Sequence, residues 1–301
     1  MLRFIKSYAP LLSLIALLSS CDSNNNPTQT AVELRDYAEQ FAEDDALLVE
    51  YLTTHFYNYE DFVGAGEEEI TIVIDTIAGD NANKTPMINQ VQQISVPVTD
   101  TEGVEIDHTL YYLIAKQGSR LEDRPSIVDS VYLTYTGTLL DGTVFDRRIS
   151  APIWFDNIAV ISGFRYGLQF FAPGTSIRSE DGIDTFLNKG QGIILMPSGI
   201  GYFGSSLGSL PEYSPLVFNV GIITTKQNDH DLDGVLSVNE DPDGDGNPFN
   251  DDTDNDGIAN FSDADDDGDG ILTSLELDAD GDGVIDDSDG DGIPDYLDSD
   301  S

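Results

Sequence analysis

Cysteine and histidine are scarce in this sequence, and their scarcity excludes several kinds of chemistry. The 301-residue chain has one cysteine, Cys21, and three histidines. A single thiol forms no disulfide within the chain and supplies no cysteine cluster for a metal. His55 and His108 are isolated, and no motif groups a serine and an aspartate with either of them. Hydrolysis by a Ser-His-Asp triad is therefore not expected.

The chain has little long apolar sequence, and the one clear run lies at the N-terminus. Arg3 and Lys6 precede the run APLLSLIALLSS, which is too short to cross a bilayer and is typical of a signal peptide. The tetrad LSSC at 18–21 resembles a bacterial lipobox, which implies cleavage before Cys21 and lipidation of that residue. This interpretation gives a lipoprotein signal peptide over 1–21, a flexible tether over 22–29, and no thiol left for a nucleophile. An ordinary or uncleaved secretory signal is the alternative.

Basic residues are few, because 13 Lys and Arg accompany 56 Asp and Glu and the formal net charge is −43. The imbalance is concentrated in residues 229–301, which hold 27 Asp or Glu and no Lys or Arg. We therefore expect no nucleic-acid partner, since phosphate binding requires positive charge. Residues 30–226 are only mildly acidic and carry most of the aromatic and branched apolar residues. That length is enough for one or two compact cores.

Apolar residues recur at helical spacing between residues 30 and 58, which predicts one or two amphipathic helices. The stripe consists of Val32, Leu34, Tyr37, Phe41, Leu47, Leu48, Tyr51 and Leu52. A stripe with this spacing is typical of a packing surface rather than of a ligand site.

From residue 69 onward the pattern is mainly that of β-strands. Strands are expected at 69–77, 105–119, 130–137, 143–146, 151–156, 191–197 and 215–225, with one short helix over 160–171. The segment 172–190 is irregular and long for a connection, so we expect a functional flap or an insertion there. A mainly antiparallel sheet with one helix laid across it is an α+β domain.

One predicted hairpin opens a series of motifs that resembles the FKBP-type peptidyl-prolyl isomerases. Residues 134–146 read TYTGTLLDGTVFD, in which Asp-Gly supplies the positive φ of a tight turn. The family's Tyr-Thr-Gly, Asp-Gly and Phe-Asp steps stand at 135–137, 141–142 and 145–146. Its Val-Ile-x-Gly-aromatic helix start stands at 160–164, its Pro-Ser loop ending in Tyr at 197–202, and its closing Leu-Pro and Leu-x-Phe-x-Val motifs at 210–211 and 216–220.

This resemblance covers residues 108–226 and implies an FKBP-like antiparallel half-barrel sheet wrapped on one short helix. It also implies a proline pocket, whose residues by match are Tyr135, Phe145, Asp146, Val160, Ile161, Phe164, Tyr202 and Phe218. In that pocket the Ile161 N–H and the Tyr202 hydroxyl bind substrate carbonyls, and Asp146 orients the polar side. No cofactor is expected for catalysis, because rotation about an X-Pro bond requires only a surface that favours the twisted imide.

Periodicity alone supports a different interpretation of several pocket residues. Phe145, Val160, Ile161 and Phe218 have the spacing of ordinary core residues. Asp146 stands at a strand end, where an aspartate often caps a turn.

Four features depart from the family's pattern. The pocket floor, usually Trp, is Phe164, and Ile153 stands where an aromatic residue is common. The glycine that normally follows the loop tyrosine is replaced by Phe203, with Gly204 one step later, which predicts a displaced or bulged loop. Residues 175–189 look like an insertion between helix and strand.

The acidic C-terminal segment has the phase of calcium-binding loops. Residues 229–240 (DHDLDGVLSVNE) place oxygen side chains at loop positions 1, 3 and 5, Gly at position 6 and Glu at position 12. Residues 265–276 (DDDGDGILTSLE) repeat this phase, and weaker copies begin at 241, 252, 278 and 287. The expected metal ligands are Asp229, Asp231, Asp233, Glu240, Asp241, Asp243, Asp245, Asp252, Asp254, Asp256, Asp265, Asp267, Asp269, Glu276, Asp278, Asp280, Asp282, Asp287, Asp289 and Asp291.

The overlapping loops resemble the thrombospondin type 3 repeat, in which calcium ions replace a hydrophobic core. The resemblance implies structural Ca²⁺ in this tail. Without the ion, 27 like charges repel and extend the segment.

These features predict five segments: the signal peptide, the tether, a helical and β region over 30–107, an FKBP-type isomerase domain over 108–226, and calcium-binding repeats over 227–301. We expect an isomerase or chaperone that is anchored to a bacterial membrane, the outer membrane in particular, through lipidated Cys21. It acts on proline-containing segments of exported proteins, in the periplasm or at the cell surface, and its architecture resembles FKBP-like lipoproteins of Bacteroidetes. The alternative is a non-catalytic surface or adhesion module with a vestigial pocket. N-terminal helices dimerise in some relatives, and the stripe at 30–58 is a candidate for a homodimer contact.

Overall fold

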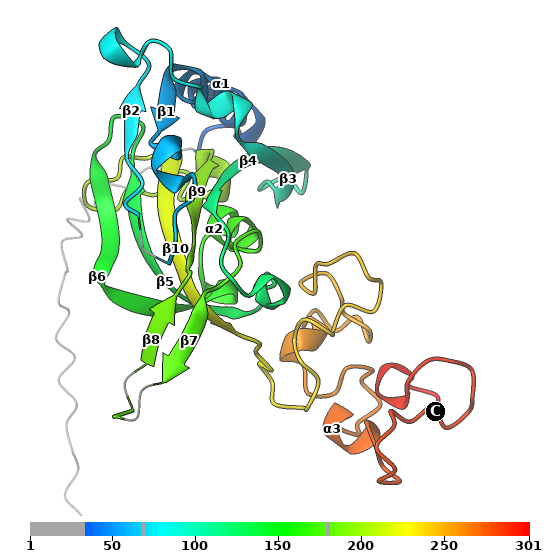
Figure 1. Ribbon diagram of the computed structural model, residues 1–301. Coiled ribbons are helices and arrows are strands. Elements are labelled where there is room, and N and C mark those ends of the chain that lie inside the picture. Colours follow the sequence, from blue (N-terminus) through cyan, green and yellow to red (C-terminus); the bar gives the residue numbers. More distant parts are fainter. Residues whose placement is uncertain (1–33, 68–69, 179–180, 183) are drawn as a thin grey trace, which may run out of the picture. The chain divides into compact units, whose positions relative to one another are not determined.

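A six-stranded antiparallel sheet forms the centre of the computed structural model (Figure 1), in the strand order β3-β4-β9-β10-β5-β6. Its strands are β3 (Gln92–Thr99), β4 (Glu105–Lys116), β5 (Ser130–Thr138), β6 (Val144–Asp156), β9 (Gly190–Met196) and β10 (Leu216–Lys226). One longer helix, α1 (Tyr37–Thr54), and one short helix, α2 (Ser162–Leu168), pack against it. The fold class is therefore α+β, as the sequence predicts.

The structure describes residues 34–67, 70–178, 181–182 and 184–301. The expectations for the signal peptide, the tether and Cys21 lie outside these residues. Residues Arg35–Ser301 form one compact unit. In the described part of the chain, no helix combines the length and apolar character needed to cross a membrane.

The two helices cover opposite faces of the sheet, and this explains the sequence of β9. Ile194 and Met196 belong to the apolar cluster that contains α2, whereas Ile193 and Leu195 belong to the cluster that contains α1. All four side chains are buried. A strand that is buried on both faces reads as a continuous apolar run rather than as an alternating one.

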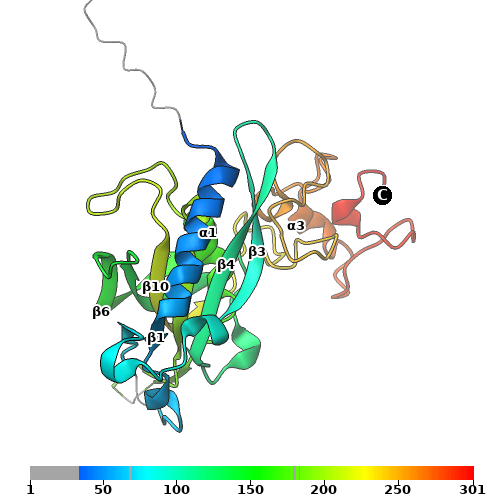
Figure 2. The ribbon, with the colours of Figure 1, turned by 90° about the horizontal axis from the view of Figure 1, so that it is seen from above.

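Helix α1 lies over one face of the sheet, beside β4 and β10 (Figure 2). The side chain of Asp36 caps its start by accepting a hydrogen bond from the Glu39 N–H at 2.8 Å. Leu48, Tyr51 and Leu52 are buried against strand residues. The described residues form one helix in this region. Leu34 and Leu47 are exposed, so only part of the stripe packs within the chain. A homodimer through it stays a prediction.

The structure contains a strand that the sequence pattern did not predict. Strand β3 pairs with β4 at the edge of the sheet, and Ile94, Val96 and Val98 pack against the core that contains α2. Pro97 lies in this strand opposite Asp107. Proline is tolerated in an edge strand, because one side of the strand needs no ladder hydrogen bond. Since β4 begins at Glu105, the sheet extends beyond the segment 108–226.

Two further segments differ from the expectation. The predicted strand at 69–77 is short, because only β2 (Ile74–Thr76) pairs, with β1 (His55–Tyr57). The segment expected to be irregular forms a hairpin of β7 (Thr175–Arg178) and β8 (Asp184–Leu187). The remaining short helical turns are η1 (Tyr59–Phe62), η2 (Gly79–Asn81), η3 (Met87–Asn89), η4 (Leu121–Asp123), η5 (Asn157–Ala159), η6 (Ser198–Ile200), η7 (Asn260–Ser262), α3 (Thr273–Glu276) and η8 (Asp295–Leu297).

The predicted hairpin joins β5 to β6, and a large bulge divides β6. The turn is closed by a hydrogen bond from the Leu139 N–H to the Thr143 carbonyl at 2.9 Å. Tyr135 pairs with Arg148 and Leu133 with Ile153, so four residues of β6 lie opposite one residue of β5. Such an insertion bends the strand and increases its local twist.

The C-terminal tail repeats one loop geometry in the phase that the sequence predicts. The glycine at loop position 6 has a positive φ in each copy, namely Gly234, Gly246, Gly257, Gly270, Gly283 and Gly292. In five copies the backbone N–H at position 2 donates to the side chain at position 9, as from His230 to Ser237 Oγ at 3.2 Å and from Asp266 to Thr273 Oγ1 at 3.1 Å. This recurring hydrogen bond joins positions 2 and 9 in each of these five loops.

Candidate functional site

The eight residues predicted for the proline pocket line a single cavity of about 360 Å³. They come from β5, β6, the segment before α2, α2 itself, the loop after β9 and β10. Four further residues complete the lining, namely Arg148, Ile153, Phe155 and Ala159. Ile153 and Phe155 adjoin the motifs in the sequence, whereas Arg148 was not anticipated.

The floor and walls of the cavity are aromatic. Phe164 of α2 and Phe218 of β10 are buried with ring centroids 4.9 Å apart, and Phe155 meets Phe164 edge to face at 6.0 Å. Phe145 meets Phe218 edge to face at 5.5 Å and is only half buried. Such edge-to-face packing fixes the rings relative to one another. The cavity is therefore a rigid apolar surface that is open at the Phe145 side.

The rings of Phe145 and Phe218 approach the backbone so closely at position 137 that only glycine fits there. A Cβ atom at this position would lie 2.6 Å from the Phe145 ring and 2.9 Å from the Phe218 ring. The glycine of the Tyr-Thr-Gly motif thus leaves room for the walls of the cavity, which gives this part of the motif a steric reason.

The polar rim of the cavity is organised around Asp146. The buried Tyr135 hydroxyl donates to Asp146 Oδ2 at 2.5 Å, and the Arg147 N–H donates to Asp146 Oδ1 at 2.8 Å. Burial, and then the hydrogen bond to Asp146, raises the pKa of Tyr135, so its hydroxyl stays protonated. The pKa of Tyr202 is also raised by burial. Among the described residues its hydroxyl has no hydrogen-bond partner, which leaves it available to a ligand.

Helix α1 holds the loop that carries Tyr202. The buried carboxylate of Asp44 accepts hydrogen bonds from the Ser198 N–H at 2.7 Å, from the Ser198 hydroxyl at 2.5 Å and from Gln40 at 2.7 Å. Burial raises the pKa of Asp44, and the hydrogen bonds from Ser198 partly offset this rise. Local sequence patterns do not predict this contact, because it joins a helix residue to a loop residue 154 positions away.

The loop that the sequence predicts to be displaced or bulged at Phe203 has an unusual backbone conformation at that residue. Phe203 has a φ of 44°, and its N–H donates to the Ser198 carbonyl at 2.9 Å. Its ring is buried and stacks on Tyr37 of α1 with a centroid distance of 3.8 Å. The residue that replaces the usual glycine therefore anchors the loop to α1.

His108 of β4 packs against this loop at Gly199. It is fully buried and its Nε2 has no partner among the described residues, while its Nδ1 lies 3.0 Å from the Ile106 carbonyl. A Cβ atom at Gly199 would lie 2.1 Å from Nε2, so only glycine fits there. Burial lowers the pKa of His108, which keeps the ring neutral.

Arg165 of α2 stabilises the segment that leads to Val160. Its guanidinium donates to the carbonyls of Asn157 at 2.8 Å and Ile158 at 3.0 Å. The same group lies over the ring of Phe249, 4.2 Å from its centroid. Phe249 belongs to the acidic tail, so the tail contacts the helix that supplies Phe164 to the cavity.

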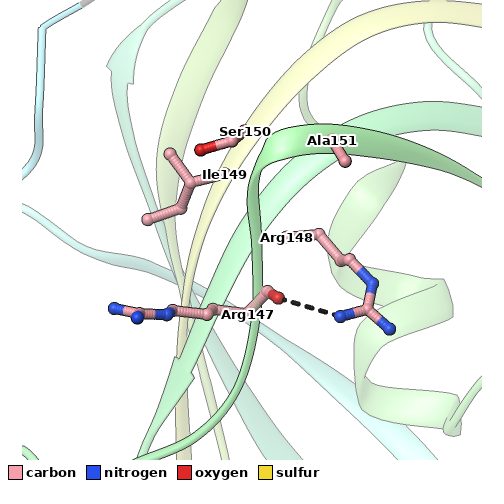
Figure 3. A pocket seen from close by; sticks show the side chains of 5 residues that line it. All are labelled: Arg147, Arg148, Ile149, Ser150 and Ala151. Atoms are coloured by element: carbon pink, nitrogen blue, oxygen red, sulfur yellow. Dashed lines mark hydrogen bonds between the residues drawn. The ribbon is translucent and has the colours of Figure 1, made fainter.

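A second hollow, of about 420 Å³, lies along β6 (Figure 3). It is lined by five consecutive residues, 147–151, all of them exposed. Figure 3 shows the side chains of Arg147 and Arg148 on opposite sides of the strand. The hollow is the inside of the β6 bulge, and no buried group faces it. We therefore assign it no binding role.

The predicted metal ligands of the tail gather in several carboxylate groups. In each group the candidate ligand oxygens lie within 4.8 Å of one another. The groups include Asp229, Asp231 and Asp233; Asp233, Glu240 and Asp266; Asp241, Asp243 and Asp251; Asp252, Asp254 and Asp256; and Asp265, Asp267 and Asp269. The remaining predicted aspartates, Asp245, Asp278, Asp280, Asp282, Asp287, Asp289 and Asp291, accept backbone N–H groups within their own loops.

These carboxylates fit a hard cation. Burial, and to a smaller extent nearby carboxylates, raises the pKa of Glu240 to about 9. Burial also raises the pKa of Glu276, to about 7, with smaller contributions from Asp267, Asp269 and Asp265. Both oxygens of Glu240 and Oε2 of Glu276 are buried without a hydrogen-bond partner among the described residues. A cation with several oxygen ligands would satisfy such groups and lower their pKa.

Sequence reasoning missed two members of these groups. Asp251 stands at position 11 and Asp266 at position 2 of their loops, which are not expected ligand positions, so the pattern gave no reason to choose them. Burial is the first cause that raises the pKa of Asp251, to about 6, and that of Asp266, to about 8. A long-range contact between loops is what brings Asp266 to Glu240, and a loop pattern does not encode that contact.

Comparison with known proteins relates the chain to FKBP-type peptidyl-prolyl isomerases. It is 30% identical over 129 residues to the FKBP-type peptidyl-prolyl cis-trans isomerase FkpA of Aeromonas hydrophila, which covers 42% of each chain. It is 28% identical over 107 residues to the outer membrane protein MIP of Legionella longbeachae, covering 35% of this chain and 40% of that protein. The crystal structure of FkpA from Escherichia coli matches with 21% identity, a TM-score of 0.34 and coverage of 62% of each chain. The chain thus spans less than half the length of these two curated relatives. The family model described as BamM C-terminal matches residues 230–285, within the acidic tail.

Proposed function

We propose that this chain is a peptidyl-prolyl cis-trans isomerase of the cell envelope that acts on proline-containing segments of exported proteins. The observation that carries this proposal is the convergence of all eight motif residues on one aromatic cavity of about 360 Å³. The similarity to FKBP-type isomerases supports it independently.

The cavity suits a reaction that needs no nucleophile. Rotation about an X-Pro bond is opposed by about 18–20 kcal/mol, because amide resonance must be broken. Water stabilises the polar resonance form of the planar imide, and the buried rings of Phe164 and Phe218 exclude water from the proline. A surface that binds the twisted imide more tightly than the planar one accelerates the exchange.

The polar rim holds the substrate while the bond turns. The Tyr202 hydroxyl and the Ile161 N–H donate to substrate carbonyls in this scheme. Asp146 is held in one orientation by Tyr135, so it presents a fixed acceptor beside the twisting imide. Fixed dipoles of this kind cost no reorganisation during the reaction.

The acidic tail binds Ca²⁺ in this proposal. Alternating carboxylates, a positive φ at every position-6 glycine and buried oxygens without partners support it. The ion gives the tail its fixed structure and takes no part in the rotation. A resemblance to thrombospondin type 3 repeats rests on the sequence phase.

The proposed location in the cell envelope rests on the N-terminal segment. Its basic start, apolar run and LSSC tetrad support export and lipidation at Cys21, and the relative named outer membrane protein MIP fits the same location. A bacterial outer-membrane lipoprotein facing the periplasm or the cell surface is the specific form of this proposal.

A proline-peptide exchange assay tests the activity. We expect Phe145→Ala and Tyr202→Phe to lower kcat/KM at least tenfold, because one removes a cavity wall and the other a donor. Val144→Ala, on the exposed neighbour of Phe145, is the matched control and retains full activity. If the wild-type protein does not accelerate exchange, the chain is instead a non-catalytic surface module with a vestigial pocket.

A further inference from the structure

Asp266 points away from the loop to which it belongs. It stands at position 2 of residues 265–276, between the two expected ligands Asp265 and Asp267. Its carboxylate lies instead with those of Asp233 and Glu240, and one oxygen from each of the three lies within 4.8 Å of the others. Glu240 ends the first loop of the tail, so two loops meet at this point.

The three carboxylates are buried, and no complete set of hydrogen bonds among the described residues offsets their loss of solvation. Glu240 and Asp266 are each 2% exposed and Asp233 is 4% exposed. Both oxygens of Glu240, both of Asp266 and Oδ2 of Asp233 have no hydrogen-bond partner among the described residues. Residues 227–301 contain no Lys or Arg, so no side chain of the tail neutralises this group. Buried carboxylates without a partner are strongly unfavourable unless a cation binds between them.

The loop of residues 229–240 needs a metal ligand from another part of the tail, because the side chain at one of its usual ligand positions is already hydrogen-bonded. At loop position 9, where a calcium loop often supplies an oxygen, stands Ser237. Ser237 is fully buried, and its hydroxyl accepts the His230 N–H at 3.2 Å and lies 2.8 Å from His230 Nδ1. That hydroxyl closes the loop on itself. An ion in the loop therefore needs a further oxygen, and the carboxylate of Asp266 lies where it can supply one.

We propose that a divalent cation of the Ca²⁺ type binds between two loops of the tail, held by Asp231, Asp233 and Glu240 from residues 229–240 and by Asp266 from residues 265–276. This inference rests on the proposed calcium-binding function of the tail and adds a bridging site to it. The ligands are all oxygens, which Ca²⁺ takes in sets of six to eight.

The bridging ion connects the isomerase domain to the distal tail. The first loop is attached to the domain, because the His230 ring lies 3.2 Å from Asp156 and the Asn228 amide donates to Ser130 Oγ at 3.0 Å. Tyr296, from the last loop, is buried beside the same carboxylates. The ion thus fixes distant repeats to a loop that is already held in place.

Calcium titration of the full chain by calorimetry tests the bridging site. We expect Asp266→Asn to lose one bound Ca²⁺, or to weaken one site at least tenfold, while loop 229–240 keeps all its own acids. Asp300→Asn removes the same charge from an exposed position in the tail and leaves every site unchanged. We expect the double variant Asp266→Asn/Glu240→Gln to be no weaker at this site than Glu240→Gln alone, because both residues serve one ion.

Terbium luminescence supplies a second readout. Tb³⁺ replaces Ca²⁺, and excitation of Tyr296 reaches only an ion bound nearby. We expect Asp266→Asn and Tyr296→Phe to lose the same component of the emission. If wild type binds calcium and Asp266→Asn binds the same number of ions with the same affinity, the bridging site is refuted and the loop sites stand. If wild type binds no calcium, the calcium-binding function of the tail fails as well.

Discussion

Asp44 of α1 accepts hydrogen bonds from both the N–H and the hydroxyl of Ser198, which lies 154 residues further along the chain. Ser198 begins the short turn that leads to Tyr202, which lines the cavity. A helix outside the motif-bearing segment thereby positions one wall of the candidate active site.

Replacing Asp44 tests this relationship. In Asp44→Asn a single oxygen remains to accept from three donors, two on Ser198 and one on Gln40, so at least one buried hydrogen bond is lost. We expect a loss of about 1–3 kcal/mol in the free energy of unfolding and a lower kcat/KM, both measured on the same preparation. Glu43→Gln, one residue earlier, removes an exposed charge whose ion pair with Arg35 contributes little. Equal stability of Asp44→Asn and Glu43→Gln would contradict the role given to Asp44.

Much of the candidate pocket was predictable because it is encoded locally. The hairpin at 134–146 and the start of α2 combine strong turn and helix signals with motif order, and every residue chosen from them lines the cavity. The loop bulge was predictable from the replacement of a glycine by Phe203.

Other features were not predictable, because they depend on contacts between distant segments. Strand β3 was missed since Pro97 argues against a strand until its edge position is known. The partnership of Asp44 with Ser198 and that of Asp266 with Glu240 join residues whose local patterns are independent of each other. Burial on both faces of β9 explains its apolar run, and only the packing of α1 and α2 makes that clear.

His108 predicts a specific loss of stability in mild acid. Burial holds its folded-state pKa below 6.5, and the Ile106 carbonyl, Asp44 and Asp107 only partly offset this. Above pH 6.5 the ring is neutral in both states, and its contribution is fully present. As the pH falls below 6.5, the unfolded state binds a proton that the folded state excludes, so stability falls until the folded pKa is reached, by up to about 1.4 kcal/mol for each unit of pKa difference.

Urea unfolding at pH 7, 6 and 5 measures this effect. The comparison of wild type with His108→Gln cancels the shared contribution of carboxylates, including Asp44, whose raised pKa acts with the opposite sign. We expect the His108→Gln variant to show a flatter dependence of stability on pH than the wild type. A profile for His108→Gln that is as steep as the wild type would remove His108 from the explanation.

Calcium is expected to compact the tail. The 27 acidic residues of 229–301 repel one another without a counterion, and ions bound in the loops neutralise them. The hydrodynamic radius of the full chain should decrease on adding millimolar Ca²⁺ and increase again with chelator. A chain truncated after Lys226 is the control and should not respond. The same radius with calcium and with chelator would refute the prediction.

Phe249 is expected to couple the tail to α2. Its ring covers the Arg165 guanidinium, and Phe249→Ala removes a cation–π contact of about 0.5–2 kcal/mol. Phe249→Tyr keeps the ring and serves as the control. We expect calcium to raise the unfolding temperature of wild type and of Phe249→Tyr by more than that of Phe249→Ala. An identical rise in all three proteins would mean that the contact transmits no stability.

The two outer strands of the central sheet have a consequence for the proposed action on proline-containing segments. One border, β3, contains Pro97, which lacks a donor, and the other, β6, is interrupted by a bulge at residues 149–152, directly after Arg147 and Arg148. Features of this kind prevent a foreign segment from joining a sheet as an extra strand. On the proposed function, a client bound at the cavity would therefore not be drawn into an extended sheet along either border.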